Sequence, residues 1–414
     1  MNKPVRQTVL PVALGGGWLG AQPQSFVEAF NQALTYDRTY LSAVAERNLG
    51  LQDANRAGLV YLPGASVENG RAPFETHSRT TYQVTQPLID MDKLANYREM
   101  TGREAYTQAT FAVKELDLAR KIYKLVSQWV QLKEMESLAL QEAQALDKQV
   151  QRAARRFELG SGSVIDVTTA QVQYTQAMAR YQALQADITF AQQRYLSATG
   201  LQTVQIFVKP DYQRAASFEL PQALIDRDVA LSPTILQAKA QVEFAQLGLT
   251  RARNAYVPTV NAIYRTTHFN GAQDIYKGVQ ISMPTGLSAY SLSARQRAEL
   301  DIQKAEAALA EAMEQVRLES VSGGFSLKAY AQEMAYRSKA VEISQATVAS
   351  TEKAYEAGVA KATDVVNAIL ASFDVQRQRL NLHMTLSEQS LSYQLSKGVK
   401  PADAMTLTQS LFTP

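Results

Sequence analysis

RFELG at residues 156–160, followed by VIDV at residues 164–167, recurs 198 residues later as AYEAG at residues 354–358 and ATDV at residues 362–365. Each copy lies between two long alanine-rich segments. Shorter landmarks repeat at nearly the same offset and in the same order, such as YLP and YVP, or the later ATG and SKG. A duplicated helix, turn and helix of this length indicates a repeat architecture. The sequence therefore predicts one unit present twice.

Composition narrows the class of protein. The chain has 414 residues, 46% hydrophobic content and a formal net charge of +3. Ala, Gln, Leu, Glu, Lys and Arg dominate long stretches without Pro, which is typical of extended helices and coiled coils. The small charge, with no run of basic and aromatic residues, gives no reason to expect a nucleic-acid partner. The absence of cysteine excludes disulfides, thiolate metal sites, a catalytic thiol and a lipidated N-terminal Cys.

The N-terminus predicts an export signal over residues 1–21. Lys3 and Arg6 precede an apolar stretch from Val9 to Leu19, and small residues follow it. A disordered, glycine-rich start is the alternative. No other stretch has about 18 consecutive apolar residues, so a membrane-crossing form of this chain would need strands instead of helices.

The segments around the two turns have the periodicity of helices packed on partners. After Val167 the apolar or small residues alternate steps of three and four, which is a heptad pattern. They are Ala170, Tyr174, Ala177, Tyr181, Leu184, Ile188, Ala191 and Tyr195. The segments 92–157 and 288–355 contain no Pro, and each predicts a helix of roughly 100 Å. The return segments 164–198 and 362–397, and the entering segments 25–57 and 233–255, are about half as long, so two of them placed end to end match one long helix.

Two β-hairpins are expected between the entering and the long helices. Residues 65–70 and 80–86 form the first, and residues 259–270 and 275–283 form the second, with Pro at each boundary. Their apolar residues alternate with polar ones, as a barrel with a wet lumen requires. Four strands cannot close a barrel alone, so the pattern predicts that several copies pool their strands.

These elements divide the chain into a first repeat at residues 22–200, an equatorial linker at 201–222, a second repeat at 223–398 and an equatorial tail at 399–414. The expected fold class is mostly α with a small β part. Long antiparallel coiled-coil helices form the α part.

In order and duplication, these motifs resemble the TolC family of outer membrane factors. The resemblance extends from Ser25 to Gly398 and rests on YLP and YVP, on QPLIDMDK, on both turns and on the closing SATG and LSKG. It implies a homotrimer in the Gram-negative outer membrane, with a 12-stranded transmembrane β-barrel and a periplasmic α-barrel. It also implies a periplasmic adaptor (membrane fusion protein), an inner-membrane ABC or RND-type transporter and outer-membrane lipid as partners. The implied function is a passive exit duct in tripartite efflux or type I secretion.

The resemblance also assigns residues to a pore constriction at the periplasmic end. Asp364 matches the first of two acidic positions, while the second is Asn367 here. Tyr355 matches a residue that latches the closed state, and Asp166 matches its partner in the first repeat. The family's basic latch residue falls at Ala360, next to Lys361, so the latch is either altered or supplied by Lys361. The tips that dock on the adaptor are Gly160, Ser161, Gly162, Gly358, Val359 and Ala360.

Simpler interpretations stay open at these positions. Asp166 and Asp364 also suit acidic residues in the first turn of a helix, and Tyr355 also suits a core position. His77, His268 and His383 lie on separate segments without metal-ligand spacing, and no Ser lies in a nucleophile elbow. We therefore expect no catalytic site, no metal and no cofactor. A soluble periplasmic coiled-coil adaptor or tether without a pore is the alternative function, and the transported substrate is left open.

Overall fold

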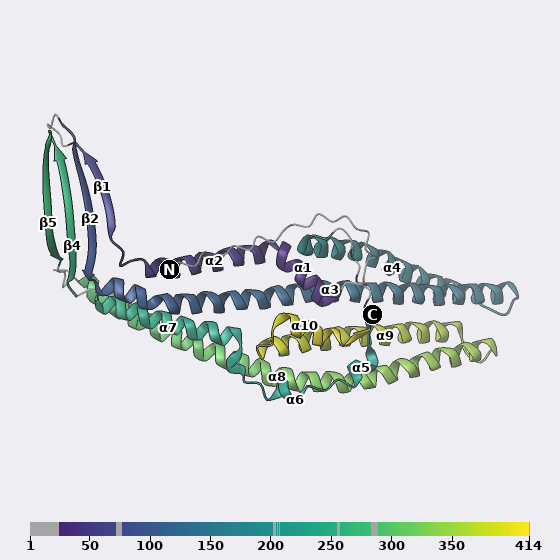
Figure 1. Ribbon diagram of the computed structural model, residues 1–414. Coiled ribbons are helices and arrows are strands. Elements are labelled where there is room, and N and C mark those ends of the chain that lie inside the picture. The colour runs from purple at the N-terminus through teal and green to yellow at the C-terminus, as the bar shows by residue number, and fades with distance from the viewer. Residues whose placement is uncertain are drawn as a thin grey trace.

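A four-stranded sheet stands at one end of a bundle of long helices, and two helical tips form the opposite end (Figure 1). The computed structural model describes residues 25–71, 77–201, 204, 206, 208–254, 257–282 and 289–413. The export signal expected at residues 1–21 lies outside this range. The predicted class, mostly α with a small β part, is confirmed.

Two helices of equal length run from the sheet to the tips. They are α3 (Met91–Glu158) and α8 (Ala289–Glu356), with 68 residues each. At about 1.5 Å per residue each is roughly 100 Å long. Both agree within one residue at each end with the helices predicted from the Pro-free segments.

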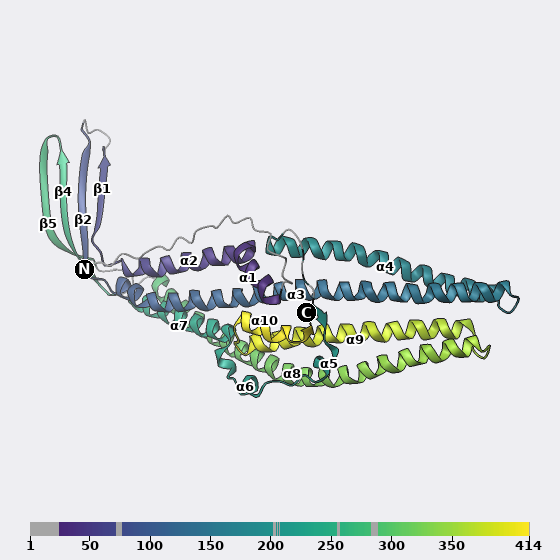
Figure 2. The same ribbon diagram turned by 45° about the vertical axis from the view of Figure 1, so that its right-hand side comes forward.

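Half-length helices line these two rods end to end. Next to α3, α2 (Arg38–Gly58) covers the half nearer the sheet and α4 (Val164–Thr199) covers the half nearer the tips. Next to α8, α7 (Pro233–Asn254) and α9 (Ala362–Ser396) do the same, and α7 also packs on α3 (Figures 1 and 2). The predicted match of two halves to one long helix is confirmed.

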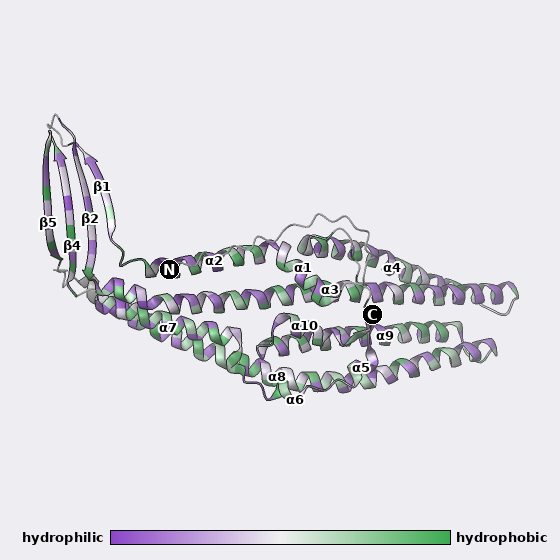
Figure 3. Cartoon of the chain, viewed as in Figure 1, coloured by the Kyte–Doolittle hydropathy of each residue, from purple (hydrophilic) through white to green (hydrophobic). Residues whose placement is uncertain are grey.

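The heptad seam of α4 is confirmed by burial. Ala170, Ala177, Ile188, Ala191 and Tyr195 are buried, while the three remaining seam positions are half-buried. Polar and apolar residues are interleaved along all the long helices (Figure 3). Each helix therefore buries only a stripe of its surface within one chain.

The first entering segment was expected as one helix over residues 25–57, and this was wrong. The chain breaks at Asp37, between α1 (Phe26–Tyr36) and α2, because Asp37 adopts an extended backbone conformation. Its carboxylate accepts a hydrogen bond of 3.0 Å from the Tyr40 backbone N–H and pairs with the Lys121 ammonium. Asp37 is therefore the N-cap of α2, a role that stops one helix and starts the next.

The strands β1 (Gly64–Gly70), β2 (Arg79–Ile89), β4 (Thr259–Phe269) and β5 (Ala272–Ser282) form one antiparallel sheet in the order β1-β2-β4-β5. The connection expected at residues 271–274 is shorter, because Asn270 and Gly271 alone turn the chain with φ of 48° and 78°. Met283, expected to end the last strand, lies outside the described residues.

Pro87 was expected to end a strand but lies inside β2. The register shifts between Pro87 and Ile89, which is the irregularity that a residue without an N–H imposes on a ladder.

An equatorial belt, formed by residues 208–231 and 399–413, lies against the bundle near the middle of its length (Figure 1). It contains β3 (Lys209–Pro210), α5 (Tyr212–Ala216), α6 (Gln222–Ile225), the 3-10 helix η1 (Val229–Leu231), α10 (Pro401–Gln409) and β6 (Phe412–Thr413). The strands β3 and β6 pair, so the two ends of the belt meet.

An aromatic cluster holds the belt to the bundle. The Phe26 ring lies 5.3 Å from the Tyr123 ring and 5.1 Å from the Phe412 ring, between centroids. His383 lies against Phe412 and Tyr212 at 5.0 and 5.6 Å. This cluster joins α1, α3, α9 and the C-terminal tail.

Candidate functional site

The two tips fold in the same way. Gly160 and Gly358 have φ of 72° and 80°, which a glycine adopts at low cost. The N–H of each donates to the carbonyl three residues earlier, at 2.9 and 3.0 Å, and the next N–H donates to the carbonyl five residues before it, at 2.9 Å in both tips. The repeat seen in the sequence is therefore a repeat of the turn geometry.

Apolar side chains lie exposed on both tips. Val359 is 84% exposed and Leu159 is 76% exposed, and Ile165 at the start of α4 is 70% exposed. Ser161 is exposed, and its hydroxyl donates to the Arg156 carbonyl at 3.2 Å. Gly162 and Ala360 are half-buried behind them. The six predicted adaptor-contact residues thus lie at the end of the molecule farthest from the sheet.

Asp166 and Asp364 occupy equivalent positions in the first turns of α4 and α9. The Asp166 carboxylate accepts a hydrogen bond of 3.4 Å from the Ser163 N–H, and the Asp364 carboxylate accepts one of 2.9 Å from the Lys361 N–H. Both acids therefore cap their helices. Asp364 remains exposed, so the capping role leaves its charge available to solvent at the tip. Asn367, also exposed, follows one helical turn later.

Tyr355 is buried, with 5% of its surface exposed, in a cluster with Leu146, Val365 and Ile369. Besides this apolar packing, it contacts Arg156 of the other hairpin. The guanidinium carbon lies 4.5 Å from the centre of the Tyr355 ring, and Arg156 Nη1 donates to the Tyr355 carbonyl at 2.9 Å. Asp166 does not contact Tyr355 through any hydrogen bond between described residues. Lys361 is exposed, and no ion pair joins it to another described residue.

Arg152, one turn before Arg156, makes a second link between the hairpins. Its guanidinium lies 3.0 Å from the Glu352 carboxylate and 3.8 Å from that of Glu356. Arg156 is the first residue of the repeated RFELG turn, but neither arginine was expected to link the hairpins. The sequence did contain a signal for these links. Arg152 and Arg156 lie on the last turns of α3, and Glu352 and Tyr355 on α8 follow them at nearly the repeat offset.

A buried ion cluster ties the hairpins together farther from the tips. Glu142 on α3 is fully buried, and its two carboxylate oxygens accept hydrogen bonds from Arg180 of α4 at 2.6 Å and from Arg377 of α9 at 2.7 Å. A buried carboxylate is stable only when its charge is paired and its oxygens are bonded. The single residue Glu142 therefore fixes three helices from both repeats.

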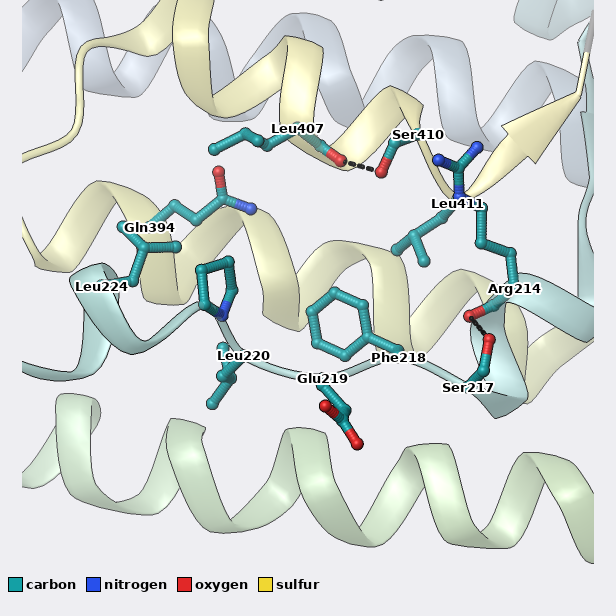
Figure 4. A pocket seen from close by; sticks show the side chains of 11 residues that line it. Arg214, Ser217, Phe218, Glu219, Leu220, Leu224, Gln394, Leu407, Ser410 and Leu411 are labelled. Atoms are coloured by element: carbon teal, nitrogen blue, oxygen red, sulfur yellow. Dashed lines mark hydrogen bonds between the residues drawn. The ribbon is translucent and has the colours of Figure 1, made fainter.

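A cavity of about 220 Å³ lies in the equatorial belt, between α9, α10 and residues 217–224 (Figure 4). Phe218, Leu224 and Leu411 contribute apolar walls. The buried amide of Gln394 lines it and donates to Ser390 Oγ at 3.0 Å. Roughly 50 Å of α9 separates this cavity from the tips, so it adds no chemistry there.

Among the described residues, no group of three or more His, Asp or Glu side chains is arranged to hold a metal ion. No helix within the described part is both long and apolar enough to cross a membrane.

Comparisons with known proteins agree with this architecture. The family profile described as "Outer membrane efflux protein" matches residues 30–201, which lie within the first repeat. Outer membrane protein TolC of Salmonella enteritidis is 22% identical, over 98% of this chain and 89% of the relative. The proteases secretion protein PrtF of Dickeya chrysanthemi is 23% identical, over 85% of this chain and 84% of the relative.

Solved structures share the fold. The outer membrane protein VceC of Vibrio cholerae has a TM-score of 0.75 at 18% identity, covering 90% of this chain and 96% of its own. The CmeC outer membrane channel of Campylobacter jejuni has a TM-score of 0.76 at 10% identity, covering 96% and 93%. The resemblance stated from the sequence motifs is confirmed by these similarities.

Proposed function

We propose that this chain, a relative of the TolC-type outer membrane proteins, is the passive exit duct of a tripartite efflux or type I secretion system. Three copies pool their strands into one barrel in the Gram-negative outer membrane and their helices into a tunnel through the periplasm. The observation that carries the proposal is a two-faced sheet with two free edges, placed on helices of roughly 100 Å.

The two faces of the sheet differ in chemistry. We call the first the apolar face. Its residues are Ala65, Val67, Asn69, Thr80, Tyr82, Val84, Gln86, Val260, Ala262, Tyr264, Thr266, His268, Gln273, Ile275, Lys277, Val279 and Ile281. The opposite, polar face contains the charged residues Glu68, Arg79, Arg265 and Asp274. Apolar residues outside and polar residues inside are what a membrane barrel with a wet lumen requires.

The free edges indicate how copies join. Strands β1 and β5 each have only one neighbour in the sheet. Pairing β5 of one copy with β1 of the next removes these edges, and repeating it around a ring closes the barrel. Because β5 leads into α8 and β1 follows α2, the same step places α8 of one copy beside α2 of the next.

The outward face of α8 supports this arrangement. Phe325 and Tyr336 are 74% and 77% exposed, and on the other side of the molecule Leu49 of α2 and Phe190 of α4 are 66% and 62% exposed. Large apolar side chains exposed on both flanks are typical of a surface that a partner covers. A second copy of the chain supplies such a partner on each flank.

The tips are the proposed contact with the adaptor and, through it, with the inner-membrane transporter. Their exposed apolar residues Leu159, Ile165 and Val359 support a protein contact there. Asp364 and Asn367 line the proposed constriction, where a ring of three carboxylates favours cations. Arg156, rather than Lys361, is the better supported partner of Tyr355 in the closed state.

The test is extraction of the full chain in detergent, followed by native mass spectrometry and recording in planar bilayers. We expect trimers that conduct ions. Phe325→Glu should reduce the trimer fraction, whereas Gln332→Glu, a change at an exposed polar position of the same helix, should not. Recovery of the wild-type chain as a monomer in the aqueous fraction, without conductance, would support the tether alternative and overturn the proposal.

A further inference from the structure

One cation lies on the apolar face of the sheet. Lys277 of β5 is exposed and lies directly opposite Tyr264 of β4, with its ammonium 5.6 Å from the centre of the Tyr264 ring. Val84 continues the same row on β2. A charged side chain in a lipid-facing row is costly unless its charge reaches water, a headgroup or a counter-ion.

No acid of the described sheet can neutralise Lys277 from this face. The acids in the four strands, Glu68 and Asp274, lie on the polar face, in register with Thr81 and Thr267. The cation–π contact with Tyr264 lowers the free-energy cost of placing the Lys277 ammonium on this face, but it does not neutralise the charge.

A neighbouring copy supplies no acid either. In the proposed ring, β1 of the next copy lies beside β5, and on the apolar face it presents Ala65, Val67 and Asn69. No acid of the described strands, in this copy or the next, therefore pairs with Lys277 on this face, so we look to a group of the surrounding membrane for the counter-charge.

The position of Lys277 along β5 indicates which part of the membrane supplies the counter-charge. Toward the Asn270-Gly271 turn, the next row contains Ile275 and Thr266, and the row after that is polar, with Gln273 opposite His268. Rows are separated by about 7 Å. The polar row is therefore about 14 Å from Lys277, and a lysine side chain extended toward the turn brings its ammonium roughly halfway, so a group seated between them can contact both.

The turn is the end of the sheet farthest from the helices (Figure 1). With the helices in the periplasm, this end faces the outer leaflet. The hydrogen-bonding side chains His268, Gln273 and Thr80 lie in the polar row just above. We propose that Lys277, with this row, binds a phosphate group of an anionic lipid in the outer leaflet of the outer membrane.

This inference rests on the proposed function, because it needs the barrel in a membrane. The experiment uses the full-length wild-type trimer and three variants in nanodiscs of phosphatidylcholine with or without diphosphorylated lipid A. Bound lipid is counted by native mass spectrometry. Lys277→Met removes the charge and keeps an unbranched apolar side chain, Lys277→Arg keeps the charge, and Arg265→Gln removes a cation from the polar face of the same sheet.

We expect Lys277→Met to retain lipid A about fivefold less than the wild type, since one lysine near a membrane surface contributes on that order. Lys277→Arg and Arg265→Gln should retain it like the wild type, and phosphatidylcholine retention should not change. Equal lipid A retention in Lys277→Met and wild type overturns the inference. Trimer formation and conductance are recorded for every variant. Unchanged lipid A retention in a conducting Lys277→Met trimer is failure of this inference alone, whereas a wild type that forms no conducting trimer is failure of the proposed function.

Discussion

Arg156 and Tyr355 join the tips of the two hairpins within one chain. The guanidinium of Arg156 lies over the Tyr355 ring at 4.5 Å and donates a hydrogen bond of 2.9 Å to the Tyr355 carbonyl. Tyr355 is buried, whereas Arg156 is half-buried at the last turn of α3. The contact therefore connects a half-buried side chain of the first repeat to a buried ring of the second.

Replacing Arg156 tests this contact. We expect Arg156→Gln to weaken the tip contact by about 1–2 kcal/mol, because it removes a cation–π interaction and a charged donor. Amide hydrogen exchange of residues 354–360 should be faster, and bilayer recordings should show a larger conductance.

Arg155→Gln is the matched control. Arg155 is the neighbouring, exposed arginine, and no ion pair joins it to a described residue. If both variants exchange and conduct like the wild type, Arg156 does not hold the tips together.

Glu142 offers a test of the link farther from the tips. Glu142→Gln removes the buried carboxylate that accepts from Arg180 and Arg377, which are themselves partly exposed, so we expect a loss of about 2–3 kcal/mol in unfolding free energy. Urea denaturation in detergent, followed by circular dichroism, measures it. Glu136→Gln breaks a partly exposed pair with Lys133 and should cost about 1 kcal/mol or less. Similar losses in the two variants would contradict a special role for Glu142.

The sequence predicted the elements that repeat and missed the contacts that do not. Heptads, prolines and glycines are local signals, so the helices α3, α4, α8 and α9 and their turns were predicted within one or two residues. The break at Asp37 was missed because an Asp within a helical pattern is not by itself a stop signal, and the pairing with Lys121 that accompanies its N-cap role lies 84 residues away.

The same limit applies to the candidate site. Asp166 and Asp364 were found because they recur at the same place in both turns. The roles of Arg156 and Glu142 were missed because Tyr355 and Arg377, which they contact, come from the other hairpin and are known only once the two hairpins are packed side by side. Lys361 was considered because it follows Ala360, the expected latch position, in the sequence. In the folded chain the basic residue that contacts Tyr355 is Arg156.

His383 makes the equatorial belt sensitive to acid. Burial lowers the pKa of His383 from 6.5 to about 4, and its Nε2 lies 2.9 Å from the Leu411 carbonyl oxygen. Because the unfolded chain binds the proton more readily, this contribution to stability is fully present above pH 6.5 and is lost as the pH falls toward 4. The full loss is on the order of 3 kcal/mol.

Thermal unfolding of the wild type between pH 7 and pH 4 measures this effect. We expect His383→Gln to be less stable at pH 7 but to lose less stability over this pH range. His268→Gln, a change at an exposed histidine, should keep the wild-type pH dependence. An unchanged pH dependence in His383→Gln would show that other groups cause the acid sensitivity.

The last prediction concerns Asp364, whose carboxylate both caps α9 and lies exposed at the tip. Asp364→Asn keeps an acceptor for the Lys361 N–H and removes the charge, so it separates the two roles. If three copies of Asp364 line the constriction, cation selectivity should fall in Asp364→Asn and rise in Asn367→Asp, which adds a second acid one turn later. Reversal potentials of single channels in asymmetric KCl measure the change. Asp374→Asn, at an exposed acid farther along α9, is the control. Reversal potentials equal to the wild type in both tip variants would place Asp364 outside the selective part of the pore and leave it with the capping role alone.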